Sequence, residues 1–315
     1  MSQLVAPANM SAQVNDPLVV LAENGKTFNW ARRVLGADMG LAAARLYAFC
    51  RHADDIADGD KPGGITLLSE IDAALAGEGS PPDMQTRDFL AFAHEENISL
   101  AAARDLLGGL LFDQGAVEIE TTQDLLVYCY QAAGTVGLMM ASVLNCRDKD
   151  ALAHAVCLGM GMQLTNIARD IAEDAAMGRR YVPAVWCAHA SPAEIETSTL
   201  MDRPVRADMQ DAIEALLKLA DRYYAHGYRG LAALPLRAHF SIAIAGYCYQ
   251  AIGHKLRRNR NQYWQSRTVV GLGGKIIASM KSLVTLRLRL FSLQPVADEM
   301  LAPLKRSDHV RAIRK

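Results

Sequence analysis

Stretches of apolar residues at helical spacing follow one another along almost the whole chain, and no alternation typical of a β-strand persists beyond a few residues. Alanine, leucine and methionine dominate these stretches, whereas runs of β-branched residues are short. Gly- and Pro-containing breaks at 59–64, 77–82, 178–183 and 202–204 separate the stretches, and none is long or polar enough to divide the chain. Residues 191–194 have the pattern of a capping box at a helix start. The sequence therefore predicts an all-α, single-domain helical bundle.

The expected organisation is one helical domain between two tails. We expect residues 1–16 to form a loose N-terminal tail, residues 17–295 the helical domain and residues 296–315 a basic C-terminal tail. The first basic residue is Lys26, so the N-terminal stretch lacks the basic region of a signal peptide. None of the six cysteines forms a C-x-x-C pair, which argues against a zinc site or a disulfide framework. We therefore expect a cytoplasmic protein.

The charged residues are divided unevenly along the chain. Basic and acidic residues nearly balance, at 33 and 34, and a net charge of -1 argues against a uniformly basic nucleic-acid-binding protein. Residues 253–315, however, contain 14 Lys and Arg against three Asp and Glu, which indicates an anionic ligand, an anionic surface or both. Within this segment, residues 271–293 are apolar apart from four basic side chains. This pattern is consistent both with a helix buried in the core and with a helix that binds peripherally to an anionic membrane.

The longest uncharged run is Leu125–Cys146. It is long enough to cross a bilayer but contains polar side chains, which favours a buried helix. Gly134 and Gly137 lie in its middle, where each glycine costs about 1 kcal/mol relative to alanine. Close packing against a neighbouring helix and space for a ligand are both consistent with these glycines.

Two predicted helical segments carry aspartates on one face. With roughly 100° of rotation per residue, the first stripe contains Tyr47, Arg51, Asp54 and Asp58, and the second contains Gln163, Asn166, Asp170 and Asp174. Two carboxylates one turn apart repel each other, so a ligand has to offset the repulsion. Oxygen donors without Cys or His suit a hard cation, and Mg²⁺ takes one or two carboxylates together with substrate phosphates. One such motif usually marks a solvated face, but the two together, with flanking arginines, predict a Mg²⁺-bridged diphosphate site over an apolar cavity.

Several longer strings resemble those of one known family. They are Lys26–Phe28, Leu46–Asp58, Tyr128–Gly137, Gln163–Asp174 and Gly178–Pro183. These strings resemble the motifs of the squalene/phytoene synthase family, over the span from about residue 24 to residue 275. Among members of this family, the sequence Gln163–Asp174 is most similar to that of bacterial phytoene synthases. The resemblance implies an isoprenoid-synthase helical bundle around a central apolar cavity.

The resemblance also implies a role for each matching residue. It assigns Mg²⁺, with Mn²⁺ as an alternative ion, to Asp54, Asp58, Asp170 and Asp174, assisted by Asn166. It assigns diphosphate contacts to Arg51, Arg169, Arg180, Tyr249 and Arg267, together with a loop formed by Lys26 and Thr27. It assigns the prenyl cavity to Phe28, Tyr47, Tyr128, Ala132, Val136, Gly137 and Gln163. Two positions depart from the family pattern: Thr27 stands where a serine is common, and Asn261 where a tyrosine is common, with Tyr263 displaced. The register between Leu256 and Arg267 is therefore open.

The implied activity is Mg²⁺-dependent, head-to-head prenyl transfer of the phytoene synthase type. Two geranylgeranyl diphosphates would condense through a cyclopropyl diphosphate to phytoene, in carotenoid biosynthesis, with either Tyr128 or the released diphosphate as the base. No strand-linked G-x-G-x-x-G motif is present, and we expect no NADPH requirement. The nearest alternative is a squalene or dehydrosqualene synthase that uses farnesyl diphosphate. A chain-elongating prenyltransferase, a terpene cyclase and a non-catalytic assembly factor are more remote, because the long strings and all four aspartates are intact. The oligomeric state is left open.

Overall fold

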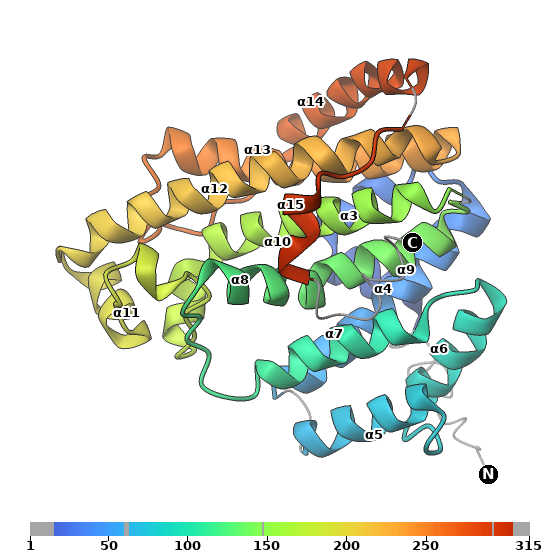
Figure 1. Ribbon diagram of the computed structural model, residues 1–315, viewed down its shortest axis with the longest axis horizontal. Helices are drawn as coiled ribbons and strands as arrows, with labels where there is room; N and C mark the ends of the chain where they lie inside the picture. Colours follow the sequence, from blue (N-terminus) through green and yellow to red (C-terminus); the bar gives the residue numbers. More distant parts are fainter. Residues whose placement is uncertain (1–15, 60–62, 147, 292, 305–315) are drawn as a thin grey trace, which may run out of the picture.

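The computed structural model describes residues 16–59, 63–146, 148–291 and 293–304, and within these ranges the chain forms helices and no strand (Figure 1). The α-helices are α2 (Pro17–Asn24), α3 (Lys26–Arg32), α4 (Ala37–Ala57), α5 (Gly64–Ala76), α6 (Met84–Glu95), α7 (Leu100–Phe112), α8 (Thr122–Cys129), α9 (Thr135–Val143), α10 (Asp150–Ala176), α11 (Pro192–Leu200), α12 (Val205–Arg229), α13 (Leu236–Arg258), α14 (Leu272–Ser282) and α15 (Asp298–Leu301). The shorter elements are a π-helix, η1 (Tyr130–Gly134), and the 3₁₀ segments η2 (Ala184–Trp186), η3 (Gly230–Ala233), η4 (Leu283–Leu290) and η5 (Ala302–Leu304).

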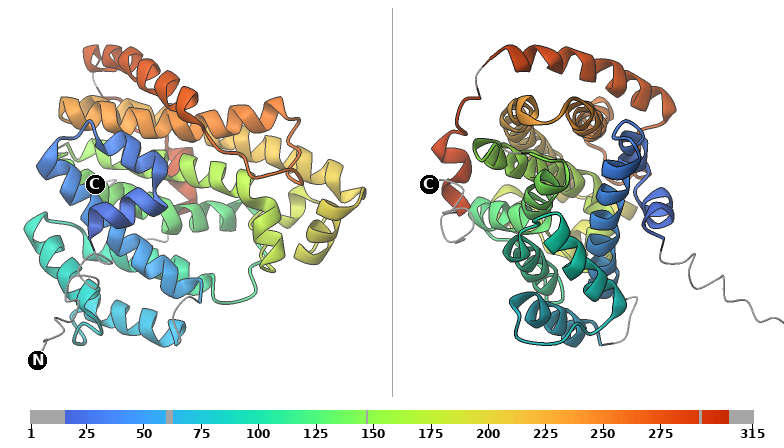
Figure 2. Two further views of the ribbon diagram at one scale, coloured as in Figure 1. Left: turned by 180° about the vertical axis from the view of Figure 1, so that it is seen from behind. Right: turned by 90° about the vertical axis from the view of Figure 1, so that its right-hand side faces the viewer.

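Helix α10 runs through the middle of the bundle and packs along α12, α9 and α13. Beyond it on one side lie α12 and α13, and α14 crosses over α13 as the outermost helix (Figure 2). On the other side lie α7, α5 and α6, while α4 contacts α5, α6, α7 and α9. The predicted all-α bundle is therefore confirmed.

Local signals in the sequence set several helix starts. Asp16 accepts a hydrogen bond from the backbone N–H of Leu18 at 2.8 Å and caps α2, which has proline in its first turn. Ser191 and Glu194 form the predicted capping box at the start of α11, and each side chain bonds the other residue's backbone N–H. These bonds satisfy N–H groups that have no partner inside the helix.

In the described part of the chain, two helical stretches are apolar and long enough to cross a membrane, Thr122–Val143 and Asp150–Ala176. Length and composition alone select them, and both lie inside the bundle. More than half of each apolar window is buried, at 56% and 61%. They are the core helices of the bundle, as predicted for residues 125–146.

The glycines of the uncharged run serve close packing. A methyl group on Gly137 would collide with the backbone carbonyl oxygen of Ala155 in α10, and one on Gly134 would lie 3.0 Å from the ring of Tyr130. Gly227 of α12 is equally close to α10, because a methyl group there would lie 2.7 Å from the Cα atom of Leu158. Only glycine lets these backbones approach so closely.

The π-helix η1 lies between α8 and α9 and changes which residues face the interior cavity. A uniform α-helix would place Thr135 and Met139 on the stripe of Tyr128, but both are fully buried in the core. Ala132, which is on the same stripe, and Val136, which is not, line the cavity. The wider turn of a π-helix shifts the side-chain register, and π segments are frequent at functional sites.

The predicted boundary at residue 296 is wrong. Met300, Leu301 and Leu304 are at most 4% exposed and belong to the main hydrophobic core. The hydroxyl of Tyr223 donates a hydrogen bond to the carbonyl oxygen of Met300 at 3.0 Å. Residues 296–304 therefore belong to the folded domain, because the apolar side chains of this short segment pack into the main hydrophobic core. Residues 1–15 and 305–315 of the two predicted tails lie outside the described residues.

Candidate active site

A polar cleft opens into an apolar cavity between α4, α10 and the helices around them. The cleft, of about 240 Å³, is lined by Arg51, Asp54, Asp113 and Tyr128 among others. The cavity, of about 290 Å³, is lined mainly by apolar side chains of α9, α10 and α13. The residues that line both spaces are Tyr47, Cys50, Ala132, Val136 and Gln163. Charged groups therefore lie at one end of a space that suits an apolar chain.

The first acidic motif lies at the C-terminal end of α4. Asp54 is in the last turn, and Asp58 is the C-cap residue. Arg51 Nη1 donates to Asp54 Oδ2 at 3.3 Å, and its other terminal nitrogen pairs with Asp55. Burial raises the pKa of Asp54 to about 6, and the nearby Asp58 adds to the rise. Negative charge is therefore disfavoured here unless a cation offsets it.

The second motif begins at Asp170 in α10. Arg169 Nε and Arg267 Nε donate to Asp170 Oδ1 at 2.6 and 2.8 Å, and Arg267 Nη2 donates to Asp170 Oδ2 at 3.0 Å. Burial acts to raise the pKa of Asp170, but these guanidinium contacts outweigh it and lower the pKa. The backbone of Asp170 departs from helical angles, with φ -102° and ψ 15°, and kinks α10 at this residue. The structure thus brings Arg267 to the second motif.

Asp174 lies one turn further along α10. Burial, together with the charge of Asp170, raises its pKa to about 8. Arg179, just beyond the helix, donates to Asp58 Oδ1 at 3.4 Å. This contact joins the segment after α10 to the end of α4, so the helix ends that carry the two predicted motifs lie near each other.

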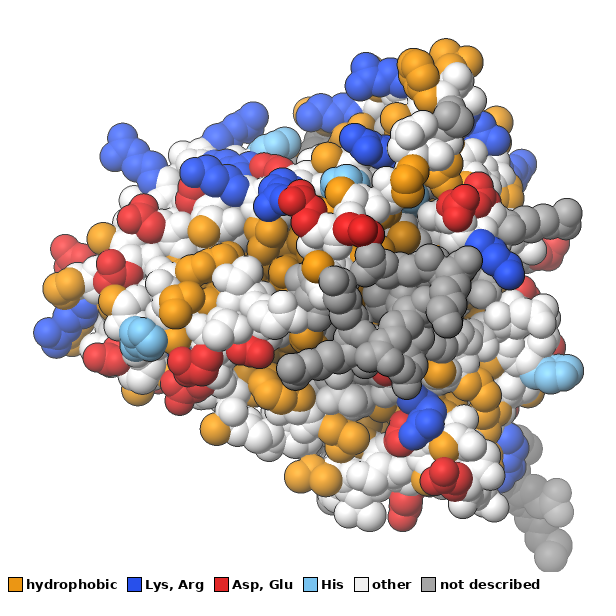
Figure 3. Space-filling model, viewed as in Figure 1, with side chains coloured by type: hydrophobic (Ala, Val, Ile, Leu, Met, Phe, Trp, Pro, Cys, Tyr) orange, Lys and Arg blue, Asp and Glu red, His pale blue; other side chains and the backbone are white. Residues whose placement is uncertain are grey.

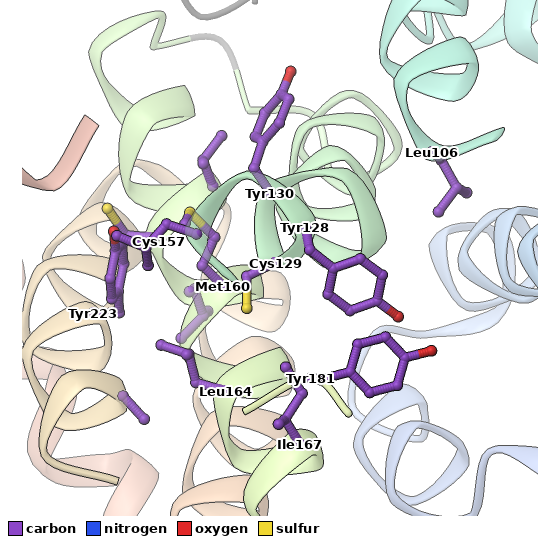
Figure 4. Packing of buried hydrophobic residues seen from close by; sticks show 14 of the residues in the cluster. Leu106, Tyr128, Cys129, Tyr130, Cys157, Met160, Leu164, Ile167, Tyr181 and Tyr223 are labelled. Carbon is purple, nitrogen blue, oxygen red and sulfur yellow. The ribbon is translucent and has the colours of Figure 1, made fainter. Parts of the chain in front are cut away.

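Asp113, at the end of α7, is a buried member of the cleft that the sequence analysis did not select. Its two carboxylate oxygens accept hydrogen bonds from Tyr181 at 2.9 Å and from Tyr128 at 3.0 Å. The two tyrosine rings are stacked with centroids 4.6 Å apart, and both hydroxyls point to the same side (Figure 4). Burial raises the pKa of Asp113 to about 6. No spacing rule links Asp113 with the two motifs, so only the fold could reveal it.

The donor set fits a hard cation. Asn166 Oδ1 is buried without a hydrogen-bond partner, while its amide nitrogen donates to Gln163 Oε1 at 3.3 Å. A buried amide oxygen without a donor, one turn from Asp170, suits an oxygen-binding ion such as Mg²⁺. Within the described residues, no three His, Cys, Asp or Glu side chains already converge on one point. Mg²⁺ commonly fills its remaining positions with water and substrate phosphates.

Aromatic rings stand where the cleft meets the cavity. The ring centroid of Phe28 lies 5.6 Å from that of Tyr249 and 6.1 Å from that of Tyr47. Burial raises the pKa of Tyr47 to about 12 and also raises the pKa of Tyr249, so both hydroxyls stay protonated. The predicted cavity residues that also line this space are Ala132, Val136, Gly137 and Gln163.

Arg180 does not occupy the place predicted for it. It is 3% exposed, and its Nη1 donates to the carbonyl oxygens of Ile119 and Val182 at 2.6 and 2.8 Å. These bonds hold the segment after α10 against the segment before α8, and nothing in them supports the predicted diphosphate contact of Arg180. Its neighbour Arg179 is the arginine that reaches the acidic cleft.

The N-terminal and C-terminal flanks of the site also differ in detail from expectation. Lys26 and Thr27 begin helix α3 and do not form a loop. After α13 the chain turns through Asn261, which has a positive φ of 54°. The hydroxyl of Tyr263 bonds that of Ser198, away from the acidic residues. Asn261 therefore occupies the position where the family commonly has a tyrosine, and the hydroxyl of the displaced Tyr263 bonds Ser198 and not a residue of the acidic motifs.

Comparisons with known proteins address the family of this chain. The profile of the squalene/phytoene synthase family matches residues 21–273. The chain belongs to this family. It is 36% identical over 258 residues to 15-cis-phytoene synthase of Enterobacter agglomerans, covering 77% of this chain and 85% of that protein. It is 34% identical to 15-cis-phytoene synthase of Paracoccus sp., covering 85% and 90% of the two chains.

Solved structures give the same fold. A ligand complex of a dehydrosqualene synthase superposes with a TM-score of 0.76 at 26% identity, covering 88% of this chain and 98% of that one. Squalene synthase HpnC of Alicyclobacillus acidocaldarius superposes with a TM-score of 0.67 at 21% identity, covering 81% and 97%. The predicted isoprenoid-synthase bundle of the squalene/phytoene synthase family is therefore confirmed.

Proposed function

We propose that this protein is a phytoene synthase that condenses two geranylgeranyl diphosphates head to head into 15-cis-phytoene. The observation that carries the proposal is the pair of acidic motifs at neighbouring helix ends, beside a polar cleft that contains Asp54 and shares lining residues with an apolar cavity. The likeness to curated phytoene synthases over most of the chain supports this choice among head-to-head synthases.

We assign ion binding to the carboxylates of Asp54, Asp58, Asp170 and Asp174 and to the amide oxygen of Asn166. When bound there, Mg²⁺ would supply positive charge that stabilises a departing diphosphate. Arg51, Arg169, Arg179 and Arg267 would donate to diphosphate oxygens, because guanidinium groups match the geometry of phosphate. In support of this assignment, each of these arginines contacts an aspartate of one of the two acidic motifs.

The cavity would guide the carbon chemistry. Departure of the first diphosphate leaves an allylic cation, and the double bond of the second substrate attacks it. Loss of a proton closes a cyclopropyl ring, and departure of the second diphosphate with rearrangement and loss of another proton gives phytoene. The rings of Phe28, Tyr47 and Tyr249 can stabilise positive charge through their faces. Apolar walls exclude water, which would otherwise trap the cation as an alcohol.

We assign proton removal to the released diphosphate. Burial, together with the charge of Asp113, raises the pKa of Tyr128 well above its usual value. The hydroxyl of Tyr128 therefore keeps its proton and serves as a hydrogen-bond donor, not as a base. We further propose that the enzyme works in the cytoplasm at the inner face of a membrane.

Product analysis tests this function. Purified protein is incubated with Mg²⁺ and either farnesyl or geranylgeranyl diphosphate, with and without NADPH, and the hydrocarbons are identified by chromatography and mass spectrometry. We expect 15-cis-phytoene from geranylgeranyl diphosphate without a reductant. A C30 hydrocarbon as the sole product would favour the dehydrosqualene or squalene synthase alternative, for which the 26% identical dehydrosqualene synthase structure is the specific support.

A further inference from the structure

The outer face of α14 and the start of η4 expose a continuous set of large apolar side chains. These residues, here called the α14 apolar surface, are between 47% and 66% exposed and comprise Leu272, Ile276, Ile277, Met280, Leu283 and Val284. Scattered apolar residues on a surface are ordinary, but a contiguous group marks an interaction site. In the space-filling view, orange side chains gather with blue ones at the edge formed by α14 (Figure 3).

The other face of α14 is already packed against the bundle. Ala278 is 3% exposed and belongs to a cluster with Ala245 of α13, and Trp30 Nε1 donates to Ser279 Oγ at 3.2 Å. Helix α14 is therefore docked through one face, and its apolar surface points away from that contact. The prediction of an ordinary core helix for this segment holds for only one of its faces.

Exposed cations accompany the apolar surface. Lys281 and Arg287 are exposed, and neither has an ion-pair partner among the described residues. A groove of about 270 Å³ between α13 and α14 adds His254, Lys255 and Arg258 on the same side. Apolar side chains interspersed with cations match the composition of helices that lie at the surface of an anionic bilayer.

We propose that the α14 apolar surface seats this protein on a membrane that contains anionic phospholipid. A twofold dimer through the same surface would bring Lys281 and Arg287 of both copies together, and like charges would oppose it. Helix α14 lies one helix away from the cavity, because Ala245 of α13 both packs near α14 and lines the cavity. A bilayer near the cavity would suit an apolar product, and this last argument alone rests on the proposed function.

Vesicle flotation with the full chain tests the proposal. Phosphatidylcholine vesicles with and without phosphatidylglycerol are compared at low and high salt. We expect binding only with phosphatidylglycerol, about fivefold weaker for each of Lys281→Gln and Arg287→Gln, and reduced by high salt. The double change Ile276→Asp and Met280→Asp should weaken binding more than tenfold. The matched control is Leu200→Asp, an 83% exposed apolar residue on α11, which should bind like the unchanged protein.

Turnover of detergent-solubilised substrate separates this test from that of the function. The α14 variants should keep the turnover of the unchanged protein, whereas failure of the proposed function would remove turnover from all of them equally. Absence of binding to anionic vesicles at low salt would overturn the membrane proposal. So would light scattering that shows a dimer of the unchanged protein and a monomer of the Ile276→Asp, Met280→Asp variant.

A second proposal concerns Asp113, and it rests on hydrogen bonds inside the cleft. We infer that Asp113 is a positioning residue that fixes the rings and hydroxyl oxygens of Tyr128 and Tyr181 beside the cleft. The two hydroxyls donate to different oxygens of one carboxylate, which fixes both rings at once. Tyr128 and Asp113 both line the cleft, so this orientation bears on whatever the cleft binds. The inference depends on the proposed function for its readout.

The same helical region offers a matched control. Tyr130 donates to Asp105 at 2.8 Å, and in Figure 4 its ring points away from those of Tyr128 and Tyr181. Asp105→Asn should leave kcat unchanged, whereas Asp113→Asn should lower kcat at least tenfold while KM changes less than threefold. If Asp113 acts through the tyrosines, combining Asp113→Asn with Tyr128→Phe should cost little more than either change alone.

Circular dichroism and thermal unfolding exclude a merely structural effect. All variants should keep the helical spectrum, and Asp113→Asn should accumulate a larger share of the cyclopropyl diphosphate if orientation matters for the second ionisation. Fully additive losses in the double variant, or an unchanged kcat in Asp113→Asn, would overturn the positioning role. Absence of turnover in the unchanged protein would instead refute the proposed function.

Discussion

Replacing Asp174 by asparagine is expected to stabilise the metal-free protein near neutral pH. Burial and the charge of Asp170 raise the pKa of Asp174 to about 8, whereas an aspartate in an unfolded chain titrates near 3.9. The folded state therefore holds the proton more tightly than the unfolded state. Stability from this group is fully present below about pH 4 and is lost as the pH rises toward 8. Asparagine keeps the shape of the side chain and removes the ionisation.

The size of the effect follows from the pKa difference. Each pKa unit corresponds to about 1.4 kcal/mol, and about three units separate pH 7 from the unfolded value, so the upper limit is about 4 kcal/mol. Relaxation and entering water lower this to roughly 1–3 kcal/mol. With roughly 2–4 °C per kcal/mol for a chain of this size class, the melting temperature should rise by about 5 °C.

The assay is thermal unfolding followed by circular dichroism in EDTA, near pH 7 and near pH 5. The gain of Asp174→Asn should be larger near pH 7, and added Mg²⁺ should stabilise the unchanged protein more than the variant. Glu70→Gln, at an exposed position of α5, is the control and should change little. A variant that is less stable near pH 7 in EDTA, or equally stabilised at both pH values, would refute the reasoning.

Three further outcomes are expected. Gly137→Ala should lower the free energy of unfolding by about 1–3 kcal/mol because its methyl group meets a backbone carbonyl, whereas Gly273→Ala, with open space around it, should be neutral or stabilising, as denaturant titration can check. Arg179→Gln should raise KM or lower kcat with little loss of stability, and Arg180→Gln should mainly destabilise the fold, as kinetics and melting curves can separate. Asp54→Asn should remove Mg²⁺-dependent turnover without loss of helicity; full activity in this variant would contradict the proposed site.

Helical periodicity was enough to predict most of the helices and both acidic motifs, because each of these features depends on residue spacing within one segment. Asp113 was beyond its reach, since its tyrosine partners come from α8 and from the segment after α10. The sequence also could not show which of Arg179 and Arg180 contacts the acidic residues. Both follow the end of a helix, and the conformation of the loop determines where each side chain points. The core position of residues 296–304 depended on a groove made by helices far away in sequence.

The clamp of Arg169 and Arg267 on Asp170 has a consequence for how ligands assemble. In the free protein these two guanidinium groups neutralise the carboxylate, so any other cation has to compete with them for its oxygens. An arginine that is displaced from Asp170 can donate its hydrogen bonds to an anion instead. We therefore expect a cation and a diphosphate to bind together more tightly than either binds alone. Isothermal titration with Mg²⁺ and inorganic diphosphate, separately and combined, would measure that coupling.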